Sequence, residues 1–132
     1  MAEAVLDTSA ILAVILAEPG AETIAAIMPQ SLVSVANEAE VITVLVRNGS
    51  PPERALEAVL GLDYEAVDLD AGLARRAGTL WRKVKPRGLS LGDRCCLALA
   101  EREGLPALTA DQRWADLELG IEVRLFRSSR KR

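Results

Sequence analysis

Short apolar runs alternate with helical stretches along nearly the whole chain, and this alternation constrains the fold more than any other feature. Helices are expected between the runs, for example over 21–28, 35–48 and 90–103. Strands that alternate with helices pair in parallel, and such a sheet needs cover on both faces. The sequence therefore predicts an α/β fold, a three-layer α/β/α sandwich on a central parallel sheet, with strands at 4–6, 31–34, 64–67, 106–109 and 121–125.

Glycine and proline set most of the other boundaries. Pro51 and Pro52 open a further helix, because a missing N–H costs nothing in a first helical turn. Helical segments are also expected over 70–84 and 110–117, with a loop at 85–88 that contains Pro86 and Gly88.

The length of 132 residues allows one compact domain with its own core. We expect a domain over residues 1–126 and a basic C-terminal tail over residues 127–132. No apolar stretch approaches the roughly 18 residues of a membrane helix, and no basic residue precedes the apolar run around Asp7. We therefore expect a cytoplasmic protein without a signal peptide or a membrane partner.

The chain contains no histidine. This excludes Ser-His-Asp and Cys-His nucleophiles, histidine acid–base pairs and zinc sites that include histidine. Its two cysteines, Cys95 and Cys96, are adjacent in an apolar stretch, so we expect two small buried side chains and no disulfide. Catalysis by this chain would depend on carboxylates, hydroxyls and bound metal ions.

Three aspartates are expected at one edge of the sheet. Asp7 directly follows the first strand, Asp111 lies two residues beyond the fourth, and Asp93 lies in the first turn of the helix that begins at Ser90. Ligands of open parallel sheets bind beyond the carboxyl ends of the strands. Each aspartate alone is well explained as a helix cap, but three that converge on one crevice indicate a site.

The helix over 35–48 carries two further candidates, Glu38 and Glu40. Residues two apart on a helix point about 200° away from each other, so only one of them faces the crevice. Glu38 shares its face with Ile42, whereas Glu40 shares its face with Thr43 and Arg47. Periodicity alone leaves both in play.

A cluster of carboxylates favours bound cations, because crowded carboxylates otherwise raise one another's pKa. Mg²⁺ and Mn²⁺ prefer oxygen ligands, and such ions activate water for the hydrolysis of phosphodiesters. A crevice of this composition is therefore compatible with a metal-dependent nuclease.

The net charge of −3 conceals a strong asymmetry. Residues 1–70 carry two basic and twelve acidic side chains, and residues 71–132 carry fourteen basic and seven acidic ones. Binding of nucleic acid depends on the local field rather than on the average charge. Aromatic residues are too few for a base-stacking platform, so any contacts to nucleic acid are expected to be with its phosphate backbone, from Arg82, Lys83, Lys85, Arg87 and Arg94.

Four stretches in register resemble the motifs of PIN domains, and within them the VapC-like ribonuclease toxins of type II toxin–antitoxin systems. The resemblance extends from Val5 to about Leu125, and it implies an α/β/α sandwich that cleaves RNA with Mg²⁺ or Mn²⁺ and binds a cognate antitoxin. The stretches are Val5-Leu6-Asp7-Thr8-Ser9-Ala10, Val33 to Val41, Leu89 to Ala98, and Leu108-Thr109-Ala110-Asp111-Gln112-Arg113-Trp114.

The resemblance also assigns roles to single residues. It decides between the two glutamates in favour of Glu40, within Ala39-Glu40-Val41, and it makes Ser9 and Thr109 hydrogen-bond donors to the acids rather than metal ligands. The implied catalytic and metal-binding residues are Asp7, Glu40, Asp93 and Asp111.

Three residues depart from the pattern or remain open. Glu38 stands where an apolar residue is expected, so it is either solvated or an additional acid near the site. Gln112 replaces a basic residue of the Thr-Ala-Asp motif, which alters a phosphate contact. Asp116 is interpreted as a helix-surface residue in preference to an accessory acid.

Other functions remain for comparison. A PIN-like module that binds RNA or protein without cutting has no reason to crowd four acids together, yet it is the main alternative. A haloacid-dehalogenase-type phosphatase expects a second aspartate at position 9, where this chain has Ser9. A receiver domain phosphorylated on aspartate expects paired acids before the phospho-acceptor strand and a lysine beyond it, and the chain fits this pattern poorly. The apolar half of the composition further predicts a homodimer.

Overall fold

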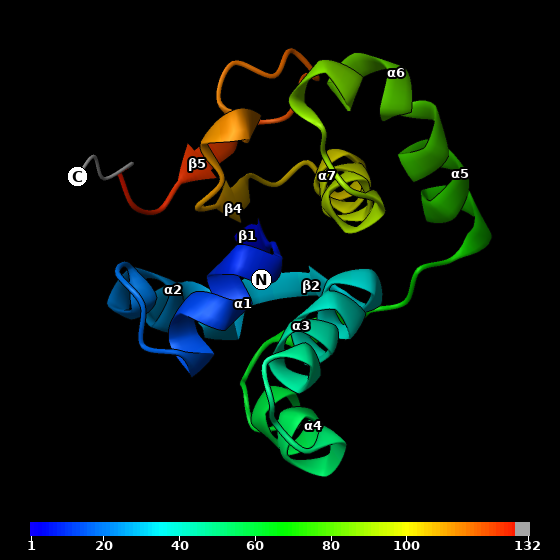
Figure 1. Ribbon diagram of the computed structural model, residues 1–132. Helices are drawn as coiled ribbons and strands as arrows, with labels where there is room; N and C mark the ends of the chain where they lie inside the picture. The colour runs from blue at the N-terminus through cyan, green and yellow to red at the C-terminus, as the bar shows by residue number, and fades with distance from the viewer. Residues whose placement is uncertain (129–132) are drawn as a thin grey trace.

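The structure, a computed structural model, describes residues 1–128 (Figure 1). Within these residues, parallel strands form one five-stranded sheet in the order β3-β2-β1-β4-β5. The parallel sheet predicted from the sequence is therefore confirmed, and each strand begins at most two residues later than expected. The strands are β1 (Ala4–Leu6), β2 (Ser31–Ser34), β3 (Glu65–Val67), β4 (Ala107–Thr109) and β5 (Val123–Leu125).

Helices cover both faces of the sheet, which confirms the three-layer sandwich (Figure 1). Four helices pack on one face: α1 (Thr8–Ile15), α2 (Ala21–Ile27), α3 (Val35–Arg47) and α4 (Pro52–Leu60). Three helices pack on the other: α5 (Ala71–Thr79), α6 (Trp81–Val84) and α7 (Leu91–Glu103).

The central strand β1 is apolar throughout because both of its faces are covered. In β1, Val5 belongs to the core beneath α5, α6 and α7, whereas Leu6 belongs to the core beneath α1 to α4. Both side chains are fully buried. Cys95 and Cys96 on α7 are buried and free, as expected.

The order of the strands reverses next to β1. Strands β2 and β3 lie on one side of it and β4 and β5 on the other, and Leu6 of β1 is in register with Leu108 of β4. A crevice forms where successive connections leave a sheet in opposite directions. The carboxyl ends of β1 and β4 therefore frame the expected position of a site.

The segment after β4 differs from the prediction. A helix over 110–117 is wrong: the chain forms only a 3₁₀ turn, η3 (Gln112–Trp114). Trp114 is fully buried, and Asp116 adopts a left-handed backbone with φ of 68°. The buried indole anchors the turn and the left-handed residue prevents its extension into a helix. The expected loop at 85–88 likewise contains a 3₁₀ turn, η2 (Lys85–Arg87).

Within residues 1–128, no helix is both long and apolar enough to span a membrane. Of the expected basic tail, residues 129–132 lie outside the described part of the chain. Arg127 lies against the segment after α1, where its guanidinium donates to the Pro19 carbonyl at 2.9 Å and pairs with Glu18 at 3.4 Å. A further 3₁₀ turn, η1 (Met28–Gln30), follows α2.

Candidate active site

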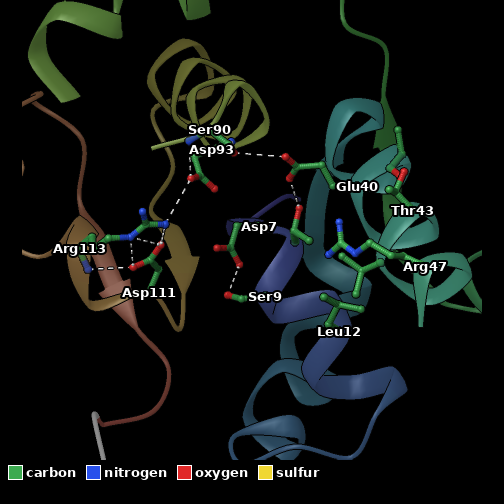
Figure 2. Close-up of a pocket in the computed structure, with 13 residues that line it drawn as sticks. Asp7, Ser9, Leu12, Glu40, Thr43, Arg47, Ser90, Asp93, Asp111 and Arg113 are labelled. Atoms are coloured by element: carbon green, nitrogen blue, oxygen red, sulfur yellow. Dashed lines mark hydrogen bonds and ion pairs between the residues drawn. The ribbon is translucent and has the colours of Figure 1, made fainter. Parts of the chain in front are cut away.

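One pocket of about 530 Å³ opens at the carboxyl ends of β1 and β4. The four acids singled out from the sequence, Asp7, Glu40, Asp93 and Asp111, all line it. Figure 2 shows the Asp7 carboxylate between Asp111 on one side and Glu40 on the other, with Asp93 facing the same space. The fold thus gathers carboxylates that are up to 104 positions apart in the chain, from Asp7 to Asp111.

Asp7 forms the floor of the pocket. It caps α1 by accepting the Ala10 N–H at 2.9 Å, and it accepts hydroxyl protons from Ser9 at 2.7 Å and Thr109 at 2.5 Å. Its side chain is only 2% exposed. Burial raises the pKa of Asp7 to about 6 despite these hydrogen bonds, with a smaller contribution from the charge of Asp93.

Glu40 projects from α3 and is held by two hydroxyl groups. Thr8 at the start of α1 donates to Glu40 Oε1 at 2.6 Å, and Ser90 donates to Oε2 at 3.2 Å. Its carboxylate lies directly against Gly92 of α7, in the space that a Cβ atom at this position would need. The glycine is therefore what allows α7 and Glu40 to approach each other.

A fully buried asparagine fixes this arrangement from below. Asn37 Nδ2 donates to Thr8 Oγ1 at 3.0 Å and to the Gly92 carbonyl at 3.3 Å, whereas its Oδ1 has no partner among residues 1–128. Thr8 thus accepts from Asn37 while it donates to Glu40. One amide links the three helices that carry the walls of the pocket.

Asp93 belongs to a capping box at the start of α7. Its carboxylate accepts the Ser90 N–H at 2.8 Å, and Ser90 Oγ accepts the Asp93 N–H at 3.1 Å. Burial raises the pKa of Asp93, and the charges of Glu40 and Asp111 raise it further. The capping role and the position in the pocket are therefore both present, as they are for Asp7.

Asp111 is paired with Arg113. The guanidinium donates to both carboxylate oxygens, with Nη2–Oδ2 at 2.6 Å and Nε contacts at 3.0 Å, and it lies 4.0 Å from Asp93 Oδ2. Burial opposes the ionisation of Asp111, but the hydrogen bonds and charge of Arg113 outweigh it and lower the pKa of this carboxyl. Arg113 also donates to the carbonyls of Arg87 and Gly88.

The donor set suits a divalent cation, although no three acidic, cysteine or histidine side chains within residues 1–128 are grouped as a metal centre. Each carboxylate is instead turned towards hydroxyls, backbone N–H groups or Arg113. Burial raises the pKa of Asp7 and of Asp93, so a nearby positive charge would favour the ionised form of both carboxyls. Oxygen ligands are what Mg²⁺ and Mn²⁺ prefer, so the residues fit such an ion.

Comparison with known proteins identifies the family. The family model described as PIN domain matches residues 4–119, which includes all four acids. The chain belongs to the PIN-domain family. The VapC ribonuclease Mb2780c of Mycobacterium bovis and the ribonuclease VapC42 of Mycobacterium tuberculosis are each 34% identical to it over 116 residues, covering 79% of this chain and 87% of the relative.

Solved structures share this PIN-domain fold. The VapBC complex of Salmonella typhimurium bound to DNA aligns with a TM-score of 0.74 at 22% identity, over 96% of this chain and 99% of that one. VapC20 of Mycobacterium tuberculosis, described as a toxin that cleaves the sarcin–ricin loop, aligns with a TM-score of 0.70 at 19% identity, over 90% and 98% of the two chains.

The other residues marked in the sequence lie outside the pocket of this PIN domain or support it. Glu38 accepts a hydrogen bond of 2.6 Å from Tyr64 Oη and does not line the pocket. Asp116 is exposed on a turn elsewhere, and Gln112 is exposed beside Asp111 without lining the pocket. Arg94 donates to the Ala77 carbonyl on α5, so its side chain is directed into helix packing and away from the pocket.

Several contributors to the site were not anticipated from the sequence. They are Thr8, Asn37, Ser90, Gly92, Arg47 and Arg113. Asn37 does leave a signal, because it shares a helical face with the buried residues Val41 and Leu45 and a lone asparagine on such a face needs partners. Arg113 leaves none, since its contacts depend on the meeting of η2 and η3.

Proposed function

We propose that this PIN-domain protein is an endoribonuclease that hydrolyses RNA phosphodiester bonds with water, in the presence of Mg²⁺ or Mn²⁺. The observation that supports the proposal most is the convergence of Asp7, Glu40, Asp93 and Asp111 on one pocket. Relatives that share a third of their residues with this chain are named ribonucleases. The absence of histidine from the chain leaves carboxylates as its acid–base groups.

The carboxylates of these four residues are the groups that would hold the ion. When bound, a divalent cation supplies Lewis-acid activation of water and offsets the charge that develops on the phosphate. The chain itself contributes orientation: Thr109 and Ser9 fix Asp7, and Thr8 and Ser90 fix Glu40. Such partners keep ligands in place before the substrate arrives.

Arg113 has a second role in this proposal. Its guanidinium neutralises Asp111 and lies 4.0 Å from Asp93 while it bridges to the backbone of the basic loop, defined here as residues 82–87. An arginine at this position is suited to a phosphate oxygen, because its fork of N–H groups matches phosphate geometry. It would compensate for Gln112 in the place of the expected basic residue.

We further propose that the protein is the toxin of a type II toxin–antitoxin pair, inhibited by a cognate antitoxin and located in the cytoplasm with its RNA substrate. Solved structures of this fold include a toxin–antitoxin complex from Klebsiella pneumoniae and a member of the VapBC family of toxin–antitoxin systems from Mycobacterium tuberculosis. A homodimer also remains a prediction. Leu56 and Leu60 on α4 are 47% and 71% exposed, which leaves apolar surface for another chain.

The decisive experiment is to co-express the protein with the product of any short adjacent reading frame, purify both, and assay RNA cleavage with and without the partner. We expect cleavage by the protein alone and inhibition by the partner. The alternative, a PIN-like module that binds without cutting, predicts RNA binding with no cleavage in either Mg²⁺ or Mn²⁺. If the Asp93→Asn variant cleaved RNA as well as the wild type, the proposed mechanism would be refuted.

A further inference from the structure

The pocket is larger than the carboxylate cluster and has a second half with a different character. Beyond Glu40 it continues between α1 and α3, where Leu12, Ala39 and Val44 line it. Figure 2 shows Leu12 on α1 opposite the α3 residues, to one side of the acids. The full volume of about 530 Å³ falls within the range of about 300–1,000 Å³ that is usual for sites of organic ligands. Two ions and a water would fill only part of it.

Arg47 closes the outer end of this apolar half. It lies seven residues after Glu40 on α3 and so returns to the same helical face, about 10 Å further along the axis. Arg47 is exposed, and its side chain lines the pocket; Figure 2 shows it extending from α3 into the space above Leu12. Within residues 1–128, its guanidinium takes part in no salt bridge. The helix dipole favours a basic side chain near the C-terminal end of α3. The dipole does not explain why the Arg47 side chain lines the pocket.

We infer that this half of the pocket is a subsite for the nucleoside next to the scissile phosphate. The inference rests on the proposed ribonuclease activity. The acids define where the scissile phosphate lies, and a flat, largely apolar base fits against the aliphatic side chains of Leu12, Ala39 and Val44. Arg47 then pairs with the following phosphate. The backbones of Glu40 and Arg47 lie about 10 Å apart along the helix axis, and both side chains line the pocket.

With a cation held by the acids, the charge of the pocket would favour a nucleotide over an acidic or apolar peptide in this subsite. The four carboxylates repel polyanions, and Arg113 and Arg47 are the basic side chains that flank them at opposite ends of the pocket. A polynucleotide would place phosphates beside the two arginines, and a cation held by the acids would offset the charge of the carboxylates. The subsite would hold its base by shape and aliphatic contact, since none of the aromatic residues within 1–128 lines it.

Two substitutions test the subsite without touching the acids. Arg47→Ala removes the phosphate contact, and we expect KM for RNA to rise about tenfold with Arg47→Lys restoring part of the loss. Ala39→Leu fills the subsite from an exposed helical position, and we expect cleavage beside purines to fall more than cleavage beside pyrimidines. Arg54→Ala on α4 and Ala25→Leu on α2 are matched controls, because both residues are exposed and distant from the pocket lining.

One readout is cleavage of a random-sequence RNA pool, with sequencing of the product ends. The other is Mn²⁺ affinity, measured by titration calorimetry. We expect unchanged Mn²⁺ binding and thermal unfolding in both variants, together with an altered base profile at one position beside the cut in Ala39→Leu. Wild-type kinetics and an unchanged base profile in both variants would overturn the subsite. The same conclusion would hold if the variants differed from wild type only in losing inhibition by a partner protein. A wild-type protein that cuts no RNA would instead refute the proposed function itself.

Discussion

The carboxylate of Glu40 occupies the space that a β-carbon at Gly92 would need, so the acid on α3 and the glycine on α7 fit together as a pair. Gly92 is the second residue of α7. At this position the lack of a side chain has a use, because it allows the Glu40 carboxylate to lie against the first turn of α7, beside Ser90 and Asp93.

The first prediction follows from this contact. Gly92→Ala should displace the flexible Glu40 carboxylate rather than the helix backbone, so we expect RNA cleavage and Mn²⁺ affinity to fall about 10- to 100-fold while the protein remains folded. Gly78→Ala on α5 is the matched control, because nothing lies within 4 Å of its added Cβ, and it should only raise stability. Calorimetric Mn²⁺ titration and thermal unfolding of both variants measure this. Equal Mn²⁺ affinity in the two would argue against the role of Gly92.

The second prediction separates the two glutamates of α3. Glu40→Gln should abolish cleavage, because Glu40 lines the pocket and Glu38 does not. Glu38→Gln should cost less than tenfold in kcat/KM, or about 1.4 kcal/mol of barrier, because its partner is Tyr64. Steady-state kinetics on one RNA substrate gives the ranking. The opposite ranking would mean that the assignment of the acids is shifted by two residues.

The third prediction concerns the dependence of stability on pH in metal-free protein. Burial raises the pKa of Asp7 to about 6 from an ordinary value of 3.8, so the folded state binds a proton more tightly than the unfolded state. The stability that this tighter proton binding contributes is fully present below about pH 4, and it is lost as the pH rises through about 6. A shift of about two units corresponds to roughly 3 kcal/mol.

Asp7→Asn removes this ionisation, so its stability relative to wild type should improve by up to about 3 kcal/mol between about pH 4 and pH 8. The lost acceptor for Thr109 lowers the stability of the variant equally at all pH values. Denaturant unfolding in EDTA at several pH values measures the difference. Parallel pH profiles for the two proteins would show that Asp7 does not titrate in this window.

The fourth prediction concerns the basic loop, residues 82–87, which adjoins the pocket through the contacts of Arg113 with the Arg87 and Gly88 carbonyls. Lys83 and Lys85 are exposed. In the catalytically dead Asp7→Asn background, Lys83→Ala with Lys85→Ala should weaken RNA binding. The slope of log K against log salt should flatten by about 1.4, because each phosphate contact contributes about 0.7 for single strands.

Metal affinity should be unchanged in this double variant, since neither lysine lines the acid pocket. Removal of the residues after Arg127 is the comparison, and it should matter less. Binding measured between about 50 and 200 mM salt tests both. An unchanged slope in the double variant, with a large loss in the truncated protein, would assign the substrate path to the C-terminal tail.

Local signals in the sequence predicted most of the fold and the positions of three acids. The buried strands are short apolar runs, and Asp7, Asp93 and Asp111 each follow a strand or cap a helix, so their common edge follows from a parallel sheet. The choice of Glu40 over Glu38 depended on family resemblance. Periodicity could not make it because the partner of Glu38, Tyr64, is 26 positions away in the chain.

What the sequence did not reveal depends on contacts between distant segments. Arg113 is held by Asp111 and by two carbonyls of the loop before α7, and these groups meet only in the folded protein. The wrong helix over 110–117 has the same origin. Its composition suits a helix, but the complete burial of Trp114 and the left-handed backbone of Asp116 are imposed by tertiary packing.

The central claim is that this pocket cleaves RNA with the help of a divalent cation. The most direct measurement follows cleavage of one labelled RNA by the wild-type protein and by Asp93→Asn, prepared identically, with Mg²⁺, with Mn²⁺ and with excess EDTA. We predict cleavage by the wild type with either ion, none with EDTA, recovery when the ion is restored, and none by Asp93→Asn. Undiminished cleavage by the wild type in excess EDTA would contradict the account.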